Sequence, residues 1–366
     1  MTVSESPAAL GLYTEIARLA LAAWGLERET ALKLVKLREN AVFAVGINIP
    51  RYVLRIHRRG YHTDGALRSE LQWMTVLGAH GIATPKVIPT TGGDLIARVE
   101  LDIATAYQCD LLAWVSGQPL GTIEQQTTQS VAVNERAYYL LGREAGKVHR
   151  HGEVWQPGPQ FQRHRWDEEG CLGKSGNWGY FGDLPSLNER DRSLLIRAAD
   201  LARKRLAVFG KSGQRFGLIH GDLVPENVLI EGERCTLIDF DDSGFGWFAY
   251  EIANAVFFLC GSDSFAPALA ALVRGYRAER ELTDEDLDML DVMLFMRGAA
   301  VLAWLHTRRE TELWKAIEPY VTDVTRALAT RLTGARDSVG VLETTWDTLQ
   351  KQNRLPGGPR TRRANK

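Results

Sequence analysis

Two polar segments near the middle of the chain carry the residue types that could do chemistry. The first reads LIHGDLVPENVLI at 218–230 and places Asp222 five residues before Asn227. The second reads CTLIDFDD at 235–242 and adds Asp239, twelve residues after Asn227. Each polar residue follows an apolar run short enough to be a strand, so a rigid scaffold can hold it at the edge of a cleft.

These groups are the ones that phosphoryl transfer requires. A carboxylate must orient the attacking hydroxyl, oxygen ligands must hold Mg²⁺, and a cation must face the triphosphate. We predict that Asp222 is the catalytic base and that Asn227 and Asp239 are the Mg²⁺ ligands, with ATP as the co-substrate. His220 ends an apolar strand, and we predict that it fixes the loop backbone through a hydrogen bond rather than acting as a base.

The order of the HGD loop, the asparagine and the later Ile-Asp-Phe resembles the aminoglycoside phosphotransferase-like branch of the protein-kinase-like superfamily. The resemblance covers roughly 39–306 and includes GFGWFAYEIA at 244–253, which fits the family's segment leading into a buried helix. The stress-response kinase, homoserine kinase and hydroxylysine kinase members are the most similar. The resemblance implies an α+β fold of two lobes, ATP at the hinge, and transfer of the γ-phosphate to a hydroxyl group.

The resemblance also assigns residues to the nucleotide. Arg55 stands in a strand where the family has a phosphate-contacting cation, usually Lys, and Glu70 on the next helix is its expected ion-pair partner. Asn40 lies in the first turn, which lacks a glycine-rich loop. We expect the Asn40 side chain to bond its own backbone and to tighten this turn over the phosphates.

Further expectations concern the hinge and the catalytic loop. A strand that passes into a Ser-Gly-Gln-Pro turn resembles the family's hinge, where the backbone groups of Ala113 and Trp114 would contact adenine. Val224 stands where ordinary protein kinases have Lys, so we expect Mg²⁺ and Arg55 to neutralise the phosphate charge. Glu251 replaces the family's Asp, and we expect it to accept backbone N–H bonds from the catalytic loop.

Residues for the acceptor are sought in the long segment at 154–184, which is rich in aromatic residues and glycines and has no regular period. Trp166 and Trp178 are candidates for the wall of an acceptor pocket, and Asp241 is a third candidate. The alternative is a hydrophobic cluster beneath a long loop. Asp242 is predicted to be a solvated turn residue, and these residues leave the identity of the acceptor open.

Periodicity predicts the elements that must position these residues. A leading helix is predicted at 8–26, where apolar residues recur at helical spacing. A second helix is predicted to begin at Thr63 or Asp64 and to end before Gly81. Antiparallel strands are predicted by β-branched runs at 32–37, 41–45, 51–57, 95–99 and 107–115. Later helices are predicted at 137–150, within 184–209, and at 248–259, 282–306 and 310–332.

This pattern predicts a two-lobed, protein-kinase-like α+β fold. The N-terminal lobe, at 1–115, combines an antiparallel sheet with a helix and a leading helix, and it binds the nucleotide. The C-terminal lobe, at 116–354, is larger and mainly helical, and it supplies the catalytic and acceptor-binding residues. The basic segment at 355–366 is predicted to be a disordered tail.

Composition excludes several classes of protein. The 366 residues carry 44 Lys and Arg against 45 Asp and Glu, a formal net charge of −1, which argues against a nucleic-acid partner. No signal peptide is apparent, and the longest apolar run, near 253–260, is about half of what a bilayer requires. We therefore expect a cytoplasmic protein with no membrane contact. The four cysteines are widely spaced and indicate neither a disulfide framework nor a zinc site.

Three functions remain open at this stage. The favoured one is an ATP-dependent kinase that acts on a hydroxyl of a small molecule. A Ser/Thr protein kinase of the stress-response type is the first alternative, although only 240–248 separates the metal-binding Asp from the next helix, which is short for an activation loop. A nucleotide-binding pseudokinase scaffold is the second, supported by Arg55 alone and opposed by Asp222, Asn227 and Asp239.

Overall fold

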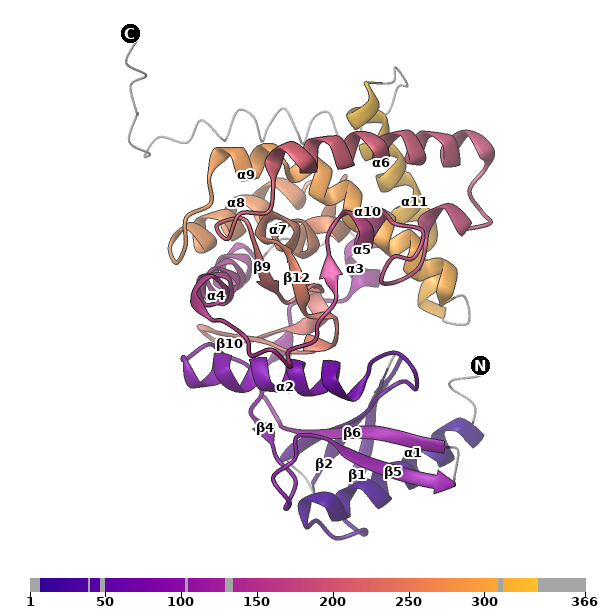
Figure 1. Ribbon diagram of the computed structural model, residues 1–366, viewed down its shortest axis with the longest axis vertical. Helices are drawn as coiled ribbons and strands as arrows, with labels where there is room; N and C mark the ends of the chain where they lie inside the picture. Colours follow the sequence, from indigo (N-terminus) through magenta and orange to yellow (C-terminus); the bar gives the residue numbers. More distant parts are fainter. Residues whose placement is uncertain are drawn as a thin grey trace.

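An antiparallel sheet flanked by two helices forms the N-terminal lobe of the computed structural model, which describes residues 7–38, 40–46, 50–102, 105–128, 134–308 and 312–334. The strands lie in the order β1-β2-β3-β6-β4, and β5 pairs with β6 (Figure 1). The elements of this lobe are α1 (Pro7–Ala20), the 3₁₀ turn η2 (Leu21–Trp24), β1 (Leu32–Leu37), β2 (Ala41–Val45), β3 (Tyr52–Ile56), α2 (Asp64–Ala79), β4 (Val87–Ile88), β5 (Ala97–Asp102) and β6 (Thr105–Ala113).

Helix α2 lies between the sheet and the C-terminal lobe (Figure 1). Thr63 is its N-cap and accepts a hydrogen bond from the N–H of Ala66 (3.2 Å), which satisfies one of the free donors of the first turn. The apolar stripe of the helix is buried, and Trp73 meets Phe240 of the C-terminal lobe edge to face. Apolar residues of α1 instead pack with Phe43, so the two helices bury different parts of the lobe.

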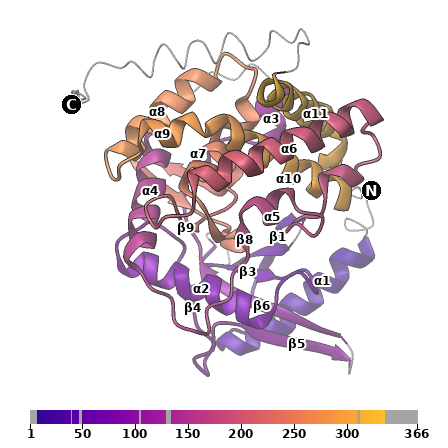
Figure 2. The same cartoon turned by 45° about the horizontal axis from the view of Figure 1, so that its top comes forward.

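The C-terminal lobe is mainly helical (Figure 2) and contains two three-stranded sheets. Its helices are α3 (Ile123–Thr128), α4 (Glu135–Val154), α5 (Glu168–Leu172), α6 (Glu189–Phe209), α7 (Phe248–Val256), α8 (Phe265–Arg277), α9 (Asp284–Asp288), α10 (Leu290–Thr307) and α11 (Glu312–Thr333). Its strands are β7 (Gln118–Pro119), β8 (Arg165–Trp166), β9 (Phe216–Ile219), β10 (Val228–Glu231), β11 (Arg234–Leu237) and β12 (Gly244–Trp247). Its short 3₁₀ turns are η3 (Phe181–Asp183), η4 (Pro225–Asn227), η5 (Phe240–Asp242) and η6 (Phe257–Leu259).

The two small sheets position the polar segments of the sequence. One sheet has the order β8-β12-β9 and the other has the order β11-β10-β7. The segment from β9 to β10 crosses from one sheet to the other and contains η4, while the segment from β11 to β12 crosses back and contains η5. The backbone N–H of Ile238 donates to the carbonyl of Asn227 (3.0 Å), so the two crossing segments are joined directly.

Helix α10 forms part of the core of this lobe, and most of its residues are buried. Within the described ranges it is the one helix long and apolar enough to cross a membrane, and 78% of that stretch is buried inside the protein. The sequence estimate rested on the apolar run at 253–260. It overlooked this longer helix because Asp291 and Arg297 interrupt the apolar residues of α10. Its apolar residues pack against neighbouring helices, above all α11 and α7.

Several boundaries differ from the sequence prediction. The helix expected within 184–209 begins at Glu189, where Asn188 caps it by accepting from the N–H of Asp191 (2.9 Å). The segment at 282–306 forms two helices, and Thr283 and Asp286 make a reciprocal capping box at the first of them. The segment at 154–184 contains short elements that the sequence pattern did not indicate. The predicted tail at 355–366 lies outside the described residues, and the division at 115–116 remains a prediction.

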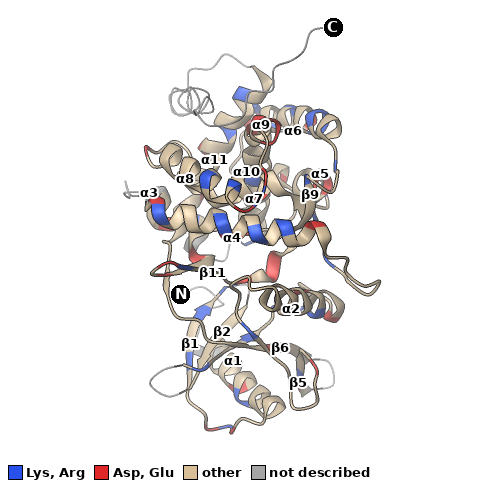
Figure 3. Cartoon of the chain, turned by 90° about the vertical axis from the view of Figure 1, so that its left-hand side faces the viewer, with Lys and Arg blue, Asp and Glu red and all other residues tan. Residues whose placement is uncertain are grey.

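Basic and acidic residues are interspersed over both lobes, and several basic residues follow one another along α4 (Figure 3). These cations have acidic partners: Arg143 and Arg150 both pair with Glu279, and Lys147 pairs with Glu144 (2.7 Å). The basic stripe on α4 is therefore largely neutralised by neighbouring carboxylates.

Candidate active site

The loop between β9 and η4, which the sequence predicts to be catalytic, is held from behind by buried groups. Glu251 of α7 accepts hydrogen bonds from the backbone N–H groups of His220 and Gly221, as the sequence predicted. The His220 ring is buried and its Nε2 lies 2.9 Å from the carbonyl of Ile238, which confirms its structural role. Gly221 has φ +83°, and a Cβ there would lie 2.3 Å from the carbonyl oxygen of Asp242, so only glycine fits this turn.

Both carboxylate oxygens of Asp222 have a donor. Oδ1 accepts from Nη2 of Arg297 at 2.6 Å, and Oδ2 accepts from Nδ2 of Asn227 at 3.1 Å. The side chain of Asp222 is 21% exposed, and it lines a cleft between the lobes. Asp222 is therefore held in one orientation while its carboxylate remains open to a ligand in the cleft.

Asp239 follows β11 and faces the same cleft as Asp222 and Asn227. Its backbone is left-handed (φ 65°), and it is the one non-glycine residue in the described ranges with a positive φ. Burial raises the pKa of its carboxyl to about 6, with Asp241 and Asp222 adding to the effect and Lys36 and Arg55 opposing it. A bound cation would stabilise the ionised form of a carboxylate in this environment.

The donor chemistry of these residues fits Mg²⁺. Asn227 and Asp239 offer hard oxygen ligands on one wall of the cleft, and Mg²⁺ characteristically takes one or two protein oxygens together with water and phosphate oxygens. Within the described residues, no group of three or more His, Cys, Asp or Glu side chains could enclose a metal by itself. A site of this kind would be completed by the phosphates of a nucleotide.

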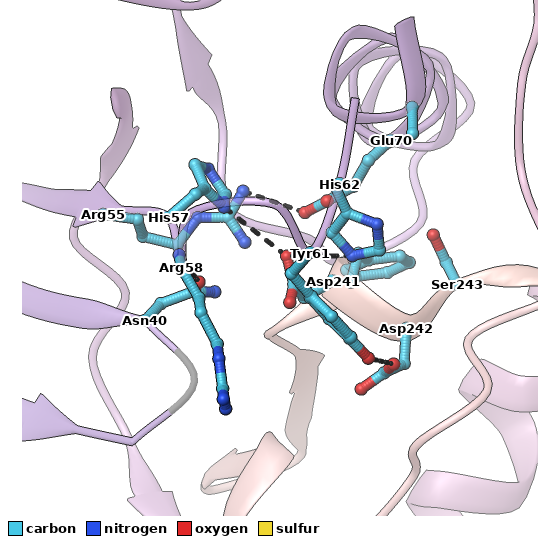
Figure 4. Close-up of polar contacts among 12 residues, drawn as sticks. Asn40, Arg55, His57, Arg58, Tyr61, His62, Glu70, Asp241, Asp242 and Ser243 are labelled. Carbon is cyan, nitrogen blue, oxygen red and sulfur yellow. Dashed lines mark hydrogen bonds and ion pairs between the residues drawn. The ribbon is translucent and has the colours of Figure 1, made fainter. Parts of the chain in front are cut away.

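Arg55 lies in a buried charge network rather than along the cleft. Its Nη2 contacts Glu70 at 2.8 Å, the pairing that the sequence predicted (Figure 4). The same guanidinium also forms two hydrogen bonds to Asp110 on β6 (2.9 and 2.8 Å), and all three side chains are nearly inaccessible. The carboxylate of Asp110 was not identified from the sequence, and the contact of Arg55 with phosphate remains a prediction.

Asp241 joins this network to the C-terminal lobe. His57 and His62 each approach its Oδ1 at 3.6 Å from the N-terminal side (Figure 4). Burial alone would raise the pKa of Asp241, but the two histidines hold it well below the usual range. Burial would likewise lower the pKa of His57, yet the charge and hydrogen bond of Asp110 at 2.6 Å raise it to about 9.

Two cations that the sequence analysis missed face the cleft directly. Lys36 and Arg38, at and just after the end of β1, pair with Glu226 of the catalytic segment at 3.4 and 2.8 Å. Burial would raise the pKa of Glu226, but these two cations lower it. The run LKLVKL predicted only a strand, and nothing local indicated that the opposite lobe would meet it.

One nucleotide prediction needs correction, and a second stays untested. Oδ1 of Asn40 accepts from the N–H of Arg58 (3.2 Å) instead of from its own turn, because β3 ends beside that turn. The N–H groups of Ala113 and Trp114 donate to the carbonyls of Lys86 (2.8 Å) and Arg51 (2.9 Å). These two N–H groups are thus already bonded to neighbouring segments, and the contact of the backbone at Ala113 and Trp114 with adenine remains a prediction. Asn40 itself lines the cleft.

The two tryptophans of the segment at 154–184 have different positions. Trp178 lines the cleft, and its indole N–H donates to Tyr61 (3.0 Å) and to Oδ1 of Asp242 (3.1 Å). Trp166 is fully buried behind it and donates to the backbone carbonyl of Asp242 (2.7 Å). The prediction that Asp242 is a solvated turn residue is wrong, because Tyr61 also donates to its carboxylate (2.8 Å; Figure 4).

Comparison with known proteins agrees with this geometry. Residues 31–285 match the sequence profile of the phosphotransferase enzyme family. Amicoumacin kinase of Bacillus subtilis is 24% identical over 297 residues, 78% of this chain and 83% of the relative. Homoserine kinase of Rhizobium meliloti is 25% identical over 311 residues, 81% of this chain and 85% of the relative.

A solved structure of a microcompartment-associated aminopropanol kinase has the same fold. It superimposes with a TM-score of 0.77 at 30% identity, covering 87% of this chain and 97% of that one. These likenesses confirm the two-lobed kinase-like fold that the sequence predicted. Since the family profile spans more than half of the sequence and the relatives are kinases of small molecules, the chain belongs to the phosphotransferase enzyme family and is an ATP-dependent small-molecule kinase.

Proposed function

We propose that the protein transfers the γ-phosphate of ATP to a hydroxyl group of a small acceptor, with Asp222 as the base and Asn227 and Asp239 as Mg²⁺ ligands. The observation that carries this proposal is the meeting of all three side chains on one wall of the interlobe cleft. Asn227 and Asp239 would hold Mg²⁺, which would neutralise the charge on the phosphates. Asp222 orients the acceptor hydroxyl through a carboxylate oxygen and accepts its proton.

The nucleotide is proposed to lie against the N-terminal lobe. In this arrangement the turn at Asn40 covers the phosphates, and the segment around Ala113 and Trp114 lies beside the base. Lys36 and Arg38 provide the cations that face the phosphates, because both line the cleft. The buried pairs of Arg55 with Glu70 and Asp110 support β3 from behind.

The acceptor is proposed to carry a cationic amine near its hydroxyl group. Five carboxylates line the cleft, namely Asp222, Glu226, Asp239, Asp241 and Asp242. Trp178 and Trp304 line it as well, and aromatic faces beside a carboxylate favour an ammonium group. The names of the aminopropanol kinase and homoserine kinase relatives agree with such an acceptor. No observation favours a protein acceptor or an inactive scaffold. The cytoplasmic location remains a prediction.

The direct test measures ATP turnover with amino alcohols and with diols of the same carbon skeleton. Asp222→Asn keeps the shape of the side chain but cannot accept a proton, so kcat should fall by about 10²–10⁴ while Mg-ATP affinity changes little. Asp242→Asn should reduce the preference for the amino alcohol, and Asp263→Asn, at an exposed site, is the control. Near-normal kcat in the Asp222 variant would remove this residue from catalysis.

A further inference from the structure

Arg297 is a buried cation in a helix that otherwise forms apolar core. It lies on α10, is 2% exposed, and is surrounded by buried residues of the same helix. An unpaired charge at such a position would be strongly destabilising, so the side chain needs a carboxylate partner. Its partner is Asp222, whose Oδ1 lies 2.6 Å from Nη2. The ring of Trp178 lies 5.2 Å from the guanidinium carbon and covers one side of it.

The surroundings of Asp222 explain why a cation is needed there. Carboxylates reach the same cleft from neighbouring elements: Asp239 after β11, Asp241 and Asp242 on η5, and Glu226 on η4. Glu226 is already paired with Lys36 and Arg38 from the opposite lobe. His220 precedes on the same loop, with its Nδ1 3.4 Å from the N–H of Asp222. Val224, two residues after Asp222, provides no charge.

We propose that Arg297 is a positioning residue for phosphoryl transfer, which fixes the orientation of the Asp222 carboxylate toward the acceptor hydroxyl. This inference rests on the proposed function. Arg297 holds Oδ1 and Asn227 holds Oδ2, so the carboxylate cannot rotate away from the acceptor. Arg297 takes over, from a helix 75 residues further along the chain, the role that a nearby lysine would have in the loop itself.

The fixed carboxylate has a defined part in the reaction. Asp222 orients the acceptor hydroxyl before the reaction starts. The acceptor oxygen then forms its bond to the γ-phosphorus, the bond between that phosphorus and the bridging oxygen breaks, and the electron pair leaves with ADP. The acceptor oxygen loses its proton to Asp222 as the new bond forms, which suits a loose transition state with little demand for early deprotonation.

The test compares Arg297→Met and Arg297→Lys by kcat and by the KM values for Mg-ATP and acceptor. Methionine removes the hydrogen bond to Oδ1 of Asp222, so kcat should fall by about tenfold to a hundredfold because the carboxylate is no longer fixed. Lysine keeps a donor but loses the forked geometry, so its kcat should fall by a smaller factor. The affinity of both variants for Mg-ATP should match that of the unmodified protein.

Two controls make the result specific. Arg280→Met removes another arginine with a largely buried side chain that pairs with a carboxylate, Glu153 at 2.6 Å, and it should lower stability without changing kcat. Repeating the kinetics at two Mg²⁺ concentrations separates Asp222 from Asp239, because only loss of a metal ligand makes the rate more dependent on the metal concentration.

An unchanged kcat in Arg297→Met would overturn the inference. If that variant does not fold, kcat of Arg297→Lys decides: an unchanged value overturns the inference and a fall at constant Mg-ATP affinity supports it. Absence of turnover in the unmodified protein with every amino alcohol and diol would instead count against the proposed function.

Discussion

Asp239 combines features that an ordinary carboxylate avoids. Its left-handed backbone is unfavourable for a residue with a Cβ, and burial among other carboxylates disfavours its charge. Strain and charge of this kind persist where function requires them. At the scale of single residues, Asp239 is therefore the position where stability and activity should oppose each other.

We expect Asp239→Asn to raise stability at pH 7.5 and to abolish Mg²⁺-dependent turnover. The folded-state pKa of about 6 exceeds the ordinary 3.8, so the folded state binds more protons between these values and stability falls as pH rises through this window. Asparagine is uncharged and tolerates the left-handed backbone.

Chemical unfolding at pH 5 and pH 7.5 checks this prediction. The gain in unfolding free energy should be larger at pH 7.5, on the order of 1–3 kcal/mol. Asp263→Asn, an exposed substitution of the same kind, should show no such gain. Equal stabilities of the Asp239 variant and the unmodified protein at pH 7.5 would contradict the burial argument.

At the scale of elements, the segment at 154–184 places one tryptophan on the cleft and another behind it. Their ring centroids are 4.8 Å apart, so the two residues share surroundings but not exposure to ligand. The sequence analysis treated Trp166 and Trp178 as equivalent candidates. The structure gives them different neighbours and hence different expected phenotypes.

We expect Trp178→Phe to raise the acceptor KM by roughly 2- to 10-fold, because the indole N–H that orients Asp242 and Tyr61 is lost. The ATP KM should change little. Trp166→Phe should instead lower stability by about 1–3 kcal/mol, since a buried carbonyl loses a donor. Steady-state kinetics and urea unfolding of both variants measure this difference, and identical kinetic effects of the two substitutions would argue against it.

Strand β1 is a second element that contributes to the site, through Lys36 near its end and Arg38 just after it. In the structure these cations contact the carboxylate of Glu226. The phosphate oxygens of a bound nucleotide could take the place of that carboxylate. Lys36→Met and Arg38→Met should each weaken ATP binding by roughly tenfold or more, because each removes a charge-assisted contact. AMP binding should be affected less, since AMP lacks the outer phosphates.

Calorimetric titration with ATP and AMP tests the role of β1. Lys33→Met provides the matched control, because Lys33 lies on the same strand and is exposed. Glu226→Gln should bind ATP at least as tightly as the unmodified protein, since it removes the competing carboxylate. Weaker ATP binding in the glutamine variant would show that Glu226 supports the site instead of competing with phosphate.

At the scale of the whole molecule, the two lobes meet through buried titratable groups. His57 and His62 come from the N-terminal lobe, and Asp241 comes from the C-terminal lobe (Figure 4). The raised pKa of His57 means that its proton is bound more tightly in the folded protein than in the unfolded chain. The resulting stabilisation is complete below about pH 6.5 and is lost as the pH rises toward about 9.

We expect the free energy of unfolding to fall between pH 6.5 and pH 9, and we expect His57→Gln to flatten this decline. Glutamine retains a donor for Asp110 but does not titrate. Urea unfolding at the two pH values measures the change, and His80→Gln is the control at an exposed histidine. A decline of the same slope in the His57 variant would show that other groups cause it.

The sequence by itself determined the features that depend on neighbours along the chain. The spacing of Asp222, Asn227 and Asp239 identified the reaction, because the strand ends that hold them are encoded within about twenty residues. Periodicity predicted the strands of the N-terminal lobe, and Thr63 marked the beginning of α2 because capping is a local interaction.

Only the tertiary structure decided which distant groups complete the site. Arg297 lies 75 residues from Asp222, and Lys36 lies 190 residues from Glu226, so no local pattern relates either pair. Arg55 illustrates the boundary: its pairing with Glu70 followed from nearby elements, but its contact with Asp110 depends on β6 lying beside β3. Burial and opposite charge select such partners only after the chain has brought them together, which is why sequence windows do not contain them.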